Sequence, residues 1–293
     1  MTFKKLFITM MALLLVVTLS SCAQKEVSII IPVGTPTYAS IFLDDSYQID
    51  TVLGADPLVA AFGAKTYDVI VAPTNLGAKF YETSDTYQCL ATISWGNLFL
   101  VSQNEITLAG LDGKDITAFG QNQTPDIIMN YVLSENDLTP NITYLASATE
   151  IASSFVLNPE GIYLVAEPQL SVLESSHTIY AIDIQQAYET LTGSHSYPQA
   201  SVFVHKDLNA STIAKIEKDL KESIDQLYNE DNLSEVATYM SLSEAVASNV
   251  IDRCHIEYVR ASEVQSDIEA YLQMIMSYNA NLLSQIPGES FYR

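Results

Sequence analysis

Short apolar runs alternate with amphipathic stretches along most of this chain. The runs are rich in valine and isoleucine and show little polar alternation, which is typical of strands buried on both faces of a sheet. Helical patterns lie between the runs, and this order predicts an α/β architecture. The strand candidates are residues 27–31, 68–72, 89–93, 98–102, 162–166, 179–182 and 202–204.

Helical periodicity dominates the last third of the chain. Between residues 209 and 229 the apolar side chains recur at steps of three or four, which places them on one face of a helix. Those positions are Ile213, Ile216, Leu220, Ile224 and Leu227. The pattern predicts further helices over residues 242–250 and 264–283.

Four strand ends run into turns that favour the start of a helix. Two turns read Thr-Pro, at Thr35 and Thr124; one reads Glu-Pro, at Glu167; and one begins with Thr74. Threonine is a good N-cap and proline is preset for the first helical turn, so the threonines are predicted to be N-caps. Ligands of open parallel sheets bind beyond the carboxyl ends of the strands, where helix N–H groups attract acceptor atoms. Four such turns, two in each half of the chain, predict a cleft between two lobes; the alternative is that each turn only starts a helix.

The N-terminus has the pattern of an export signal. Two lysines precede an uncharged apolar run over residues 6–19, which is too short to span a bilayer and has the length of a secretory signal. The Leu-Ser-Ser-Cys sequence that ends at Cys22 resembles a bacterial lipoprotein signal, in which this cysteine is lipidated and becomes the new N-terminus. We therefore expect a signal peptide at residues 1–21, a lipid on Cys22 and a tether over residues 22–26. The alternative is an ordinary signal peptide with a cysteine near its end.

Charge and cysteine content exclude several classes of function. The 293 residues include 13 lysines and arginines against 35 acids, a formal net charge of −22; loss of the leader leaves 11 basic side chains and a charge of −24. Nucleic acid and anionic lipid both require a cationic surplus, so we expect neither to bind, and the lipid on Cys22 alone would attach the protein to a membrane. Four dispersed histidines and three cysteines count against a metal site and a disulfide scaffold. The apolar pattern around Cys89 favours a buried free thiol over a disulfide with Cys254.

A series of short motifs carries a resemblance to a known family. The motifs are Gly34-Thr35-Pro36 and the segments 67–75, 95–98, 124–126, 165–169, 286–288 and 291–292. In this order and spacing the chain resembles the substrate-binding lipoproteins of bacterial ABC importers, in the branch that binds sulfonates, nitrate, taurine and thiamine precursors. The resemblance implies a two-lobed type II periplasmic-binding-protein-like fold, with a mostly parallel sheet flanked by helices in each lobe and two crossovers between the lobes. It implies that lobe one comprises residues 27–104 and 202–293, and lobe two residues 105–201.

The same resemblance implies a set of ligand-binding loops between the lobes. It assigns hydroxyl groups, carboxamides and stacking rings to Thr35, Thr74, Thr124, Asn75, Asn97, Gln123, Tyr38 and Trp95. Glu167 is the one ionisable side chain in these loops, and it either pairs with an amine or amidine of the ligand or stabilises a helix start. Trp95, the only tryptophan, has the alternative role of a core or interface anchor. The loops contain no arginine or lysine, which counts against a strongly anionic ligand held by salt bridges.

The resemblance implies a monomeric binding protein that does no chemistry and needs no cofactor. It would capture a small polar organic solute at the outer face of the cytoplasmic membrane and deliver it to an ABC permease with a cytoplasmic ATPase. An enzyme on the same fold is the first alternative, because some menaquinone-pathway and thiamine-pathway enzymes share this architecture. The absence of GxSxG, P-loop and GxGxxG motifs counts against an enzyme. A solute-sensing or adhesive surface lipoprotein without a transporter is the second alternative.

Overall fold

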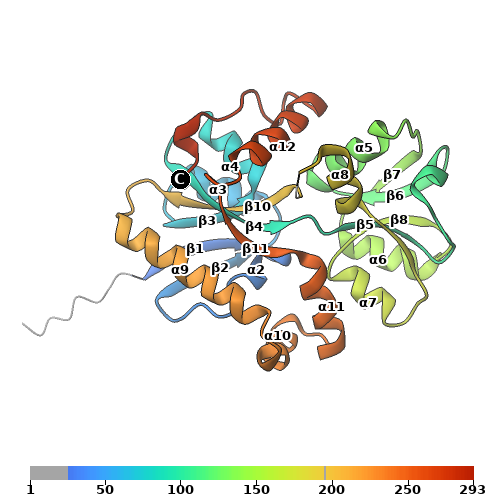
Figure 1. Cartoon of the computed structure of the whole chain (residues 1–293), viewed down its shortest axis with the longest axis horizontal. Coiled ribbons are helices and arrows are strands. Elements are labelled where there is room, and N and C mark those ends of the chain that lie inside the picture. The colour runs from blue at the N-terminus through green and yellow to red at the C-terminus, as the bar shows by residue number, and fades with distance from the viewer. Residues whose placement is uncertain (1–25, 195) are drawn as a thin grey trace, which may run out of the picture.

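The computed structural model describes residues 26–194 and 196–293, which form two α/β lobes (Figure 1). The expected signal peptide, Cys22 and most of the tether lie outside the described residues. No helix in the described part of the chain has the length and apolar character needed to cross a membrane.

The first lobe is built on a six-stranded mixed sheet in the order β11-β4-β10-β3-β1-β2. Strand β1 pairs in parallel with β2 and β3, whereas β10 runs antiparallel to β3 and β4, and β4 runs antiparallel to β11. The strands are β1 (Val27–Pro32), β2 (Tyr47–Val52), β3 (Val69–Pro73), β4 (Tyr87–Trp95), β10 (Pro198–His205) and β11 (Ile256–Arg260).

The second lobe is built on a five-stranded mixed sheet in the order β7-β6-β8-β5-β9. Strand β6 pairs in parallel with β7 and β8, and β5 runs antiparallel to β8 and β9. The strands are β5 (Leu98–Ser102), β6 (Asp115–Phe119), β7 (Asn141–Leu145), β8 (Ile162–Ala166) and β9 (Tyr180–Asp183).

Helices cover the sheets of both lobes, which confirms the predicted α/β class. The first lobe has α2 (Thr35–Tyr38), α3 (Asp56–Ala64), α4 (Thr74–Tyr81), α9 (Ala210–Leu227), α10 (Leu233–Met240), α11 (Glu244–Cys254) and α12 (Gln265–Tyr278), and short 3-10 turns at Glu230–Asn232 and Glu289–Phe291. The second lobe has α5 (Thr124–Glu135), α6 (Ala148–Leu157), α7 (Gln169–Glu174), α8 (Ile184–Thr192) and a 3-10 turn at Leu108–Leu111. Helix α9 matches its predicted range closely, and its five apolar positions are buried. Helix α12 ends earlier than predicted because its C-cap, Asn279, has extended backbone.

The lobe boundary differs from the expected one. Strand β5 was expected in lobe one, but it pairs with β8 and β9 in the second sheet. The chain therefore passes from one lobe to the other at Gly96 and Asn97, between β4 and β5 (Figure 1), and returns just before β10 begins at Pro198. The boundary implied by the family resemblance therefore misplaced β5, and an apolar strand pattern could not correct it because it does not report which sheet a strand joins.

The two crossover segments touch each other at Gly96. Its backbone N–H donates to the Ser196 hydroxyl at 3.2 Å, and a β-carbon at this position would lie 2.4 Å from the Tyr197 ring. Only glycine permits so close a passage. Tyr197 in turn packs against Tyr188 of the second lobe, with ring centroids 5.4 Å apart.

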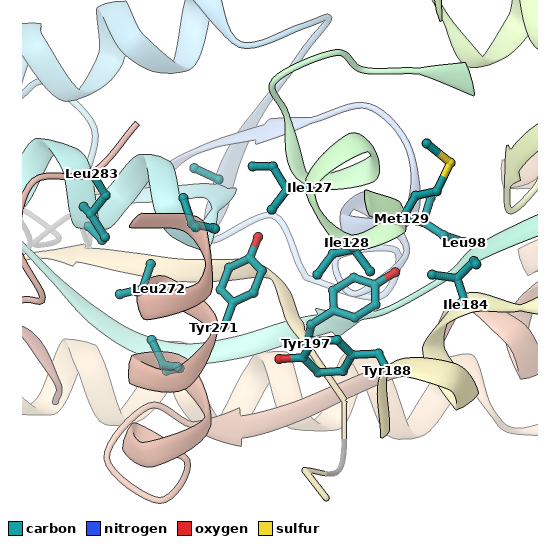
Figure 2. Close-up of a cluster of buried hydrophobic side chains, with 14 of the residues drawn as sticks. Leu98, Ile127, Ile128, Met129, Ile184, Tyr188, Tyr197, Tyr271, Leu272 and Leu283 are labelled. Carbon is teal, nitrogen blue, oxygen red and sulfur yellow. The ribbon is translucent and has the colours of Figure 1, made fainter. Parts of the chain in front are cut away.

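A hydrophobic cluster runs through the junction of the lobes (Figure 2). It joins Tyr271 and Leu272 of α12 in the first lobe to Ile127 and Ile128 of α5 in the second, all with under 1% exposure, and Tyr197 lies among them. The core is therefore continuous across the junction.

Helix α4 packs so closely on β10 that only glycine fits at one position. A β-carbon at Gly77 would lie 2.1 Å from the Phe203 ring, whereas one at Gly63, in the exposed face of α3, would meet nothing within 4 Å.

We predict that Gly77→Ala lowers the free energy of unfolding by on the order of 1–3 kcal/mol through overpacking. The matched Gly63→Ala should instead raise it by up to about 1 kcal/mol, because alanine favours helix. Urea titration of both variants measures this, and equal effects would contradict the packing described for α4.

Candidate functional site

The predicted threonine caps are each one residue inside the helix. Helices α2, α4 and α5 begin at Thr35, Thr74 and Thr124, and their N-caps are the preceding Gly34, Pro73 and Gln123. In α2 and α5 the proline takes the second helical position, so the threonine takes the first. No threonine hydroxyl caps its own helix, which leaves all three free to bond elsewhere.

Each threonine hydroxyl bonds to a residue far away in the sequence. Thr35 accepts from the Asn97 carboxamide at 2.8 Å, at the first crossover. Thr74 lies 2.8 Å from the Ser201 hydroxyl, and Thr124 lies 3.0 Å from the Tyr271 hydroxyl. The Thr124 bond joins α5 of the second lobe to α12 of the first. The Thr35 and Thr124 bonds thus lie at the junction of the lobes, whereas the Thr74 bond lies within the first lobe.

A cavity of about 280 Å³ lies between the lobes at the starts of α4 and α5. We call it the amide cavity because carboxamides from both lobes line it. They are Asn75 and Gln199 of the first lobe, and Asn122 and Gln123 of the second. Thr124, Ala55, Pro73, Leu76, Pro125 and Leu282 complete the lining. The cavity brings together three predicted site residues, Asn75, Gln123 and Thr124.

Two carboxamide oxygens of the amide cavity lack hydrogen-bond partners. Asn75 Oδ1 and Gln199 Oε1 are buried, and no described residue donates to either. A buried acceptor without a donor costs about 1–3 kcal/mol, so each carboxamide would gain free energy by turning its oxygen toward a donor bound in the cavity. Sequence reasoning missed Gln199, which lies at the start of β10, because a lone glutamine at a strand start gives no signal of its own.

Glu167 lies in a separate cluster on the other side of the junction. Its side chain is fully buried and accepts from the Ser171 hydroxyl at 2.9 Å and the Ser171 N–H at 3.2 Å. Arg253 of α11 reaches across from the first lobe and lies 3.4 Å from Glu167 and 2.6 Å from Glu174. This arginine therefore links α11 to α7, which lie side by side (Figure 1).

Burial raises the pKa of the Glu167 carboxyl above its ordinary value, although Ser171 and Arg253 both oppose the shift. Burial also raises the pKa of Tyr38, whose ring lies near this cluster, with a further contribution from Cys254. Glu167 therefore has partners within the protein, and it does not line the amide cavity.

The remaining predicted residues lie outside the amide cavity. Trp95 is 1% exposed, donates to the Glu257 carbonyl at 3.3 Å and borders a different hollow beside His255. Tyr38 and Asn97 are buried, and Thr35 and Thr74 point to protein partners. Trp95 thus makes the contacts expected of a buried core or interface anchor, which was the alternative role considered for it.

The cysteines and potential metal ligands add no reactive group to the site. Cys89 and Cys254 are both buried free thiols, as the sequence favoured, and burial raises the pKa of Cys89 to about 12. Within residues 26–194 and 196–293, no three histidine, cysteine or acidic side chains gather in a way that suits a metal ion.

Comparison with known proteins gives one family and a set of similar structures. The model of a family described as menaquinone biosynthesis matches residues 54–280. No curated protein matches.

The solved structures include an ABC transporter protein from Parabacteroides distasonis, with a TM-score of 0.79 and 20% identity over 92% of this chain and 99% of that one. The periplasmic aliphatic sulphonate binding protein of Escherichia coli has a TM-score of 0.73 and 12% identity over 92% of each chain. The ligand-binding component of an ABC-type import system from Staphylococcus aureus has a TM-score of 0.66 and 14% identity over 92% of this chain and 97% of that one. These likenesses confirm the expected two-lobed fold.

The raised pKa of Glu167 predicts a pH dependence of stability. The pKa of this carboxyl in the folded state is higher than its ordinary value of 4.5. Its contribution to the free energy of unfolding is therefore complete below pH 4.5 and is lost as pH rises through the folded-state pKa. Glu167→Gln keeps the size of the side chain and removes the titration. We predict that the stability of the wild type relative to this variant falls as pH rises from about 4 to 8. Thermal melts across this range measure the difference, and a constant difference would contradict the burial of an ionised Glu167.

Proposed function

The chain belongs to the menaquinone-biosynthesis family, but we propose that this member is an exported solute-binding protein that captures a small polar organic molecule between its lobes. The single observation that carries this proposal is the amide cavity. It lies between two lobes, at the starts of helices that follow parallel strands, where open α/β sheets bind their ligands.

The chemistry of the amide cavity favours binding over catalysis. General acids and bases in enzymes are most often histidine, carboxylates, lysine, tyrosine or cysteine. The described residues that line the amide cavity include none of these; their polar groups are carboxamides and one hydroxyl. Such groups orient a ligand by hydrogen bonds without exchanging protons with it.

Two further steps of the proposal concern where the protein acts. The lipoprotein-like leader supports export and attachment through a lipid on Cys22 to the outer face of the cytoplasmic membrane. The proteins of known structure that share the fold include components of ABC importers, which supports delivery of the solute to a permease with a cytoplasmic ATPase.

We predict that changing Cys22 to serine moves the protein from the membrane fraction to the soluble fraction, because serine cannot carry the lipid. Retention of the variant in the membrane would exclude the lipid anchor.

An enzyme of menaquinone biosynthesis is the second candidate, because the family match favours it. The reacting groups would then have to come from outside the amide cavity. The carboxylates of Asp126, which follows the lining Thr124 by two residues, and of Glu167 are both already held by protein groups: Asp126 by Asn122 and Tyr278, and Glu167 by Ser171 and Arg253. The two candidates differ in what happens to the bound molecule.

A binding protein returns its ligand unchanged. We predict that some solutes stabilise the refolded, ligand-free protein, by about 2.7 kcal/mol at a hundredfold excess over Kd. After long incubation with the protein at catalytic and stoichiometric amounts, mass spectrometry should recover each such solute without conversion. Turnover of a stabilising solute would establish the enzyme instead, and a broad panel in which nothing raises the melting temperature would remove the binding role.

A further inference from the structure

The charge of the helix starts beside the amide cavity disfavours an anion. Helix α5 carries Asp126 in its first turn, 1% exposed, where it accepts from the Asn122 N–H at 2.7 Å and the Tyr278 hydroxyl at 3.0 Å. This carboxylate already occupies the positive end of the α5 dipole. Helix α3, whose N-cap Ala55 lines the cavity, carries Asp56 in its first turn. Neither Asp126 nor Asp56 lines the cavity, and an anionic ligand would find no lysine or arginine among the described lining residues.

The cavity wall also disfavours a cation. No carboxylate lies among the described lining residues, and Asp126 already accepts hydrogen bonds from Asn122, Tyr278 and Asn130, the last at 2.6 Å. A desolvated ammonium group would therefore lack a partner of opposite charge. The fitting ligand is uncharged.

The hydrogen-bonding groups of the wall match one kind of uncharged molecule. Asn75 Oδ1 and Gln199 Oε1 each need a donor, and every carboxamide also has an NH₂ group that needs an acceptor. An amide or ureide presents an N–H and a carbonyl side by side, so it satisfies both needs of one carboxamide at once. A sugar has the donors, but it would place many hydroxyl groups against Pro73, Leu76 and Leu282.

We propose that the solute bound in the amide cavity is an uncharged amide or ureide, recognised through paired hydrogen bonds by Asn75 and Gln199. This inference rests on the proposed binding role and specifies its ligand class. It separates the protein from the sulphonate-binding protein that shares its fold, because a sulfonate is an anion.

Matched probes that differ only in charge test the ligand class. Nicotinamide, nicotinate and 3-(aminomethyl)pyridine share a ring and are neutral, anionic and cationic; uracil and orotate form a second neutral and anionic pair, and glucose represents polyols. Calorimetric titration of the full mature protein, freed of ligand by unfolding and refolding, gives the affinity for each probe. We expect at least one neutral amide or ureide to bind at least tenfold more tightly than its charged partner and than glucose.

A pair of charge-matched variants tests the recognising residues. Asn75→Asp keeps the shape and replaces the NH₂ donor with a charged oxygen, and Asn104→Asp makes the same change on an exposed loop of the second lobe. For the bound amide, Asn75→Asp should weaken affinity about tenfold and narrow or reverse the preference over 3-(aminomethyl)pyridine, while Asn104→Asp should change neither. Equal behaviour of the two variants would overturn the assignment of Asn75.

The possible failures are distinguishable. Tighter binding of nicotinate, orotate, 3-(aminomethyl)pyridine or glucose than of every neutral amide overturns the ligand class and leaves the binding role standing. Binding of no solute of any class overturns the binding role as well. Melting of each variant without ligand separates a loss of affinity from a loss of fold.

Discussion

The contact of the two crossover segments at Gly96 is the constraint on which the arrangement of the lobes depends. The first crossover passes the second so closely that a β-carbon at Gly96 would overlap the Tyr197 ring. Further bonds reinforce this point, since the Gly96 carbonyl lies 2.8 Å from His255 Nδ1 and the Asn97 carbonyl accepts from the Glu167 N–H at 3.3 Å. Because both connections are held at one place, any movement of one lobe relative to the other has to pivot about it. The amide cavity and the Glu167 cluster lie on opposite sides of that pivot.

The interlobe contacts on the two sides are different in kind. On the side of the amide cavity, the bond between Thr124 and Tyr271 and the packing around Ile127 hold α5 against α12. On the other side, Arg253 joins α11 to Glu174 of α7 and to Glu167, which precedes α7. Water and salt have little effect on the buried contacts, whereas they screen the electrostatic attraction between the partly exposed arginine and its acidic partners. The arginine link is therefore the weaker of the two and the one that solution conditions can tune.

The sequence predicted the parts of the fold that depend on local pattern. The buried strands, the amphipathic α9 and the helix starts near Thr35, Thr74 and Thr124 all follow from periodicity and turn chemistry. Strands β2, β7 and β11 were missed because each lies at a sheet edge, where a mixed burial pattern hides the strand signal. Sheet membership of β5 depends on long-range pairing, which no local pattern encodes.

The candidate site was predictable only in part, for the same reason. Asn75, Gln123 and Thr124, which follow strand ends and were assigned through the family resemblance, line the amide cavity, whereas Gln199 has no turn signal and was missed. Trp95 and Glu167 lie where their positions in the chain suggested, beside the junction, but burial and protein partners occupy them. A sequence pattern locates a residue near a cleft; whether its polar atoms remain unpaired is decided by distant residues such as Glu257 and Arg253.

Capture of a neutral solute between the lobes implies that they pivot about the crossovers and close on it. Pulsed electron–electron double resonance measures the distance between two spin labels and so reports this movement directly. The labels are placed at Lys218 in α9 and Ser153 in α6, which are exposed and lie in different lobes. We expect a broad distribution of distances in the ligand-free protein that becomes narrow and shifts when the most stabilising amide or ureide is added. A distribution that stays the same with and without that ligand would contradict closure about the crossovers.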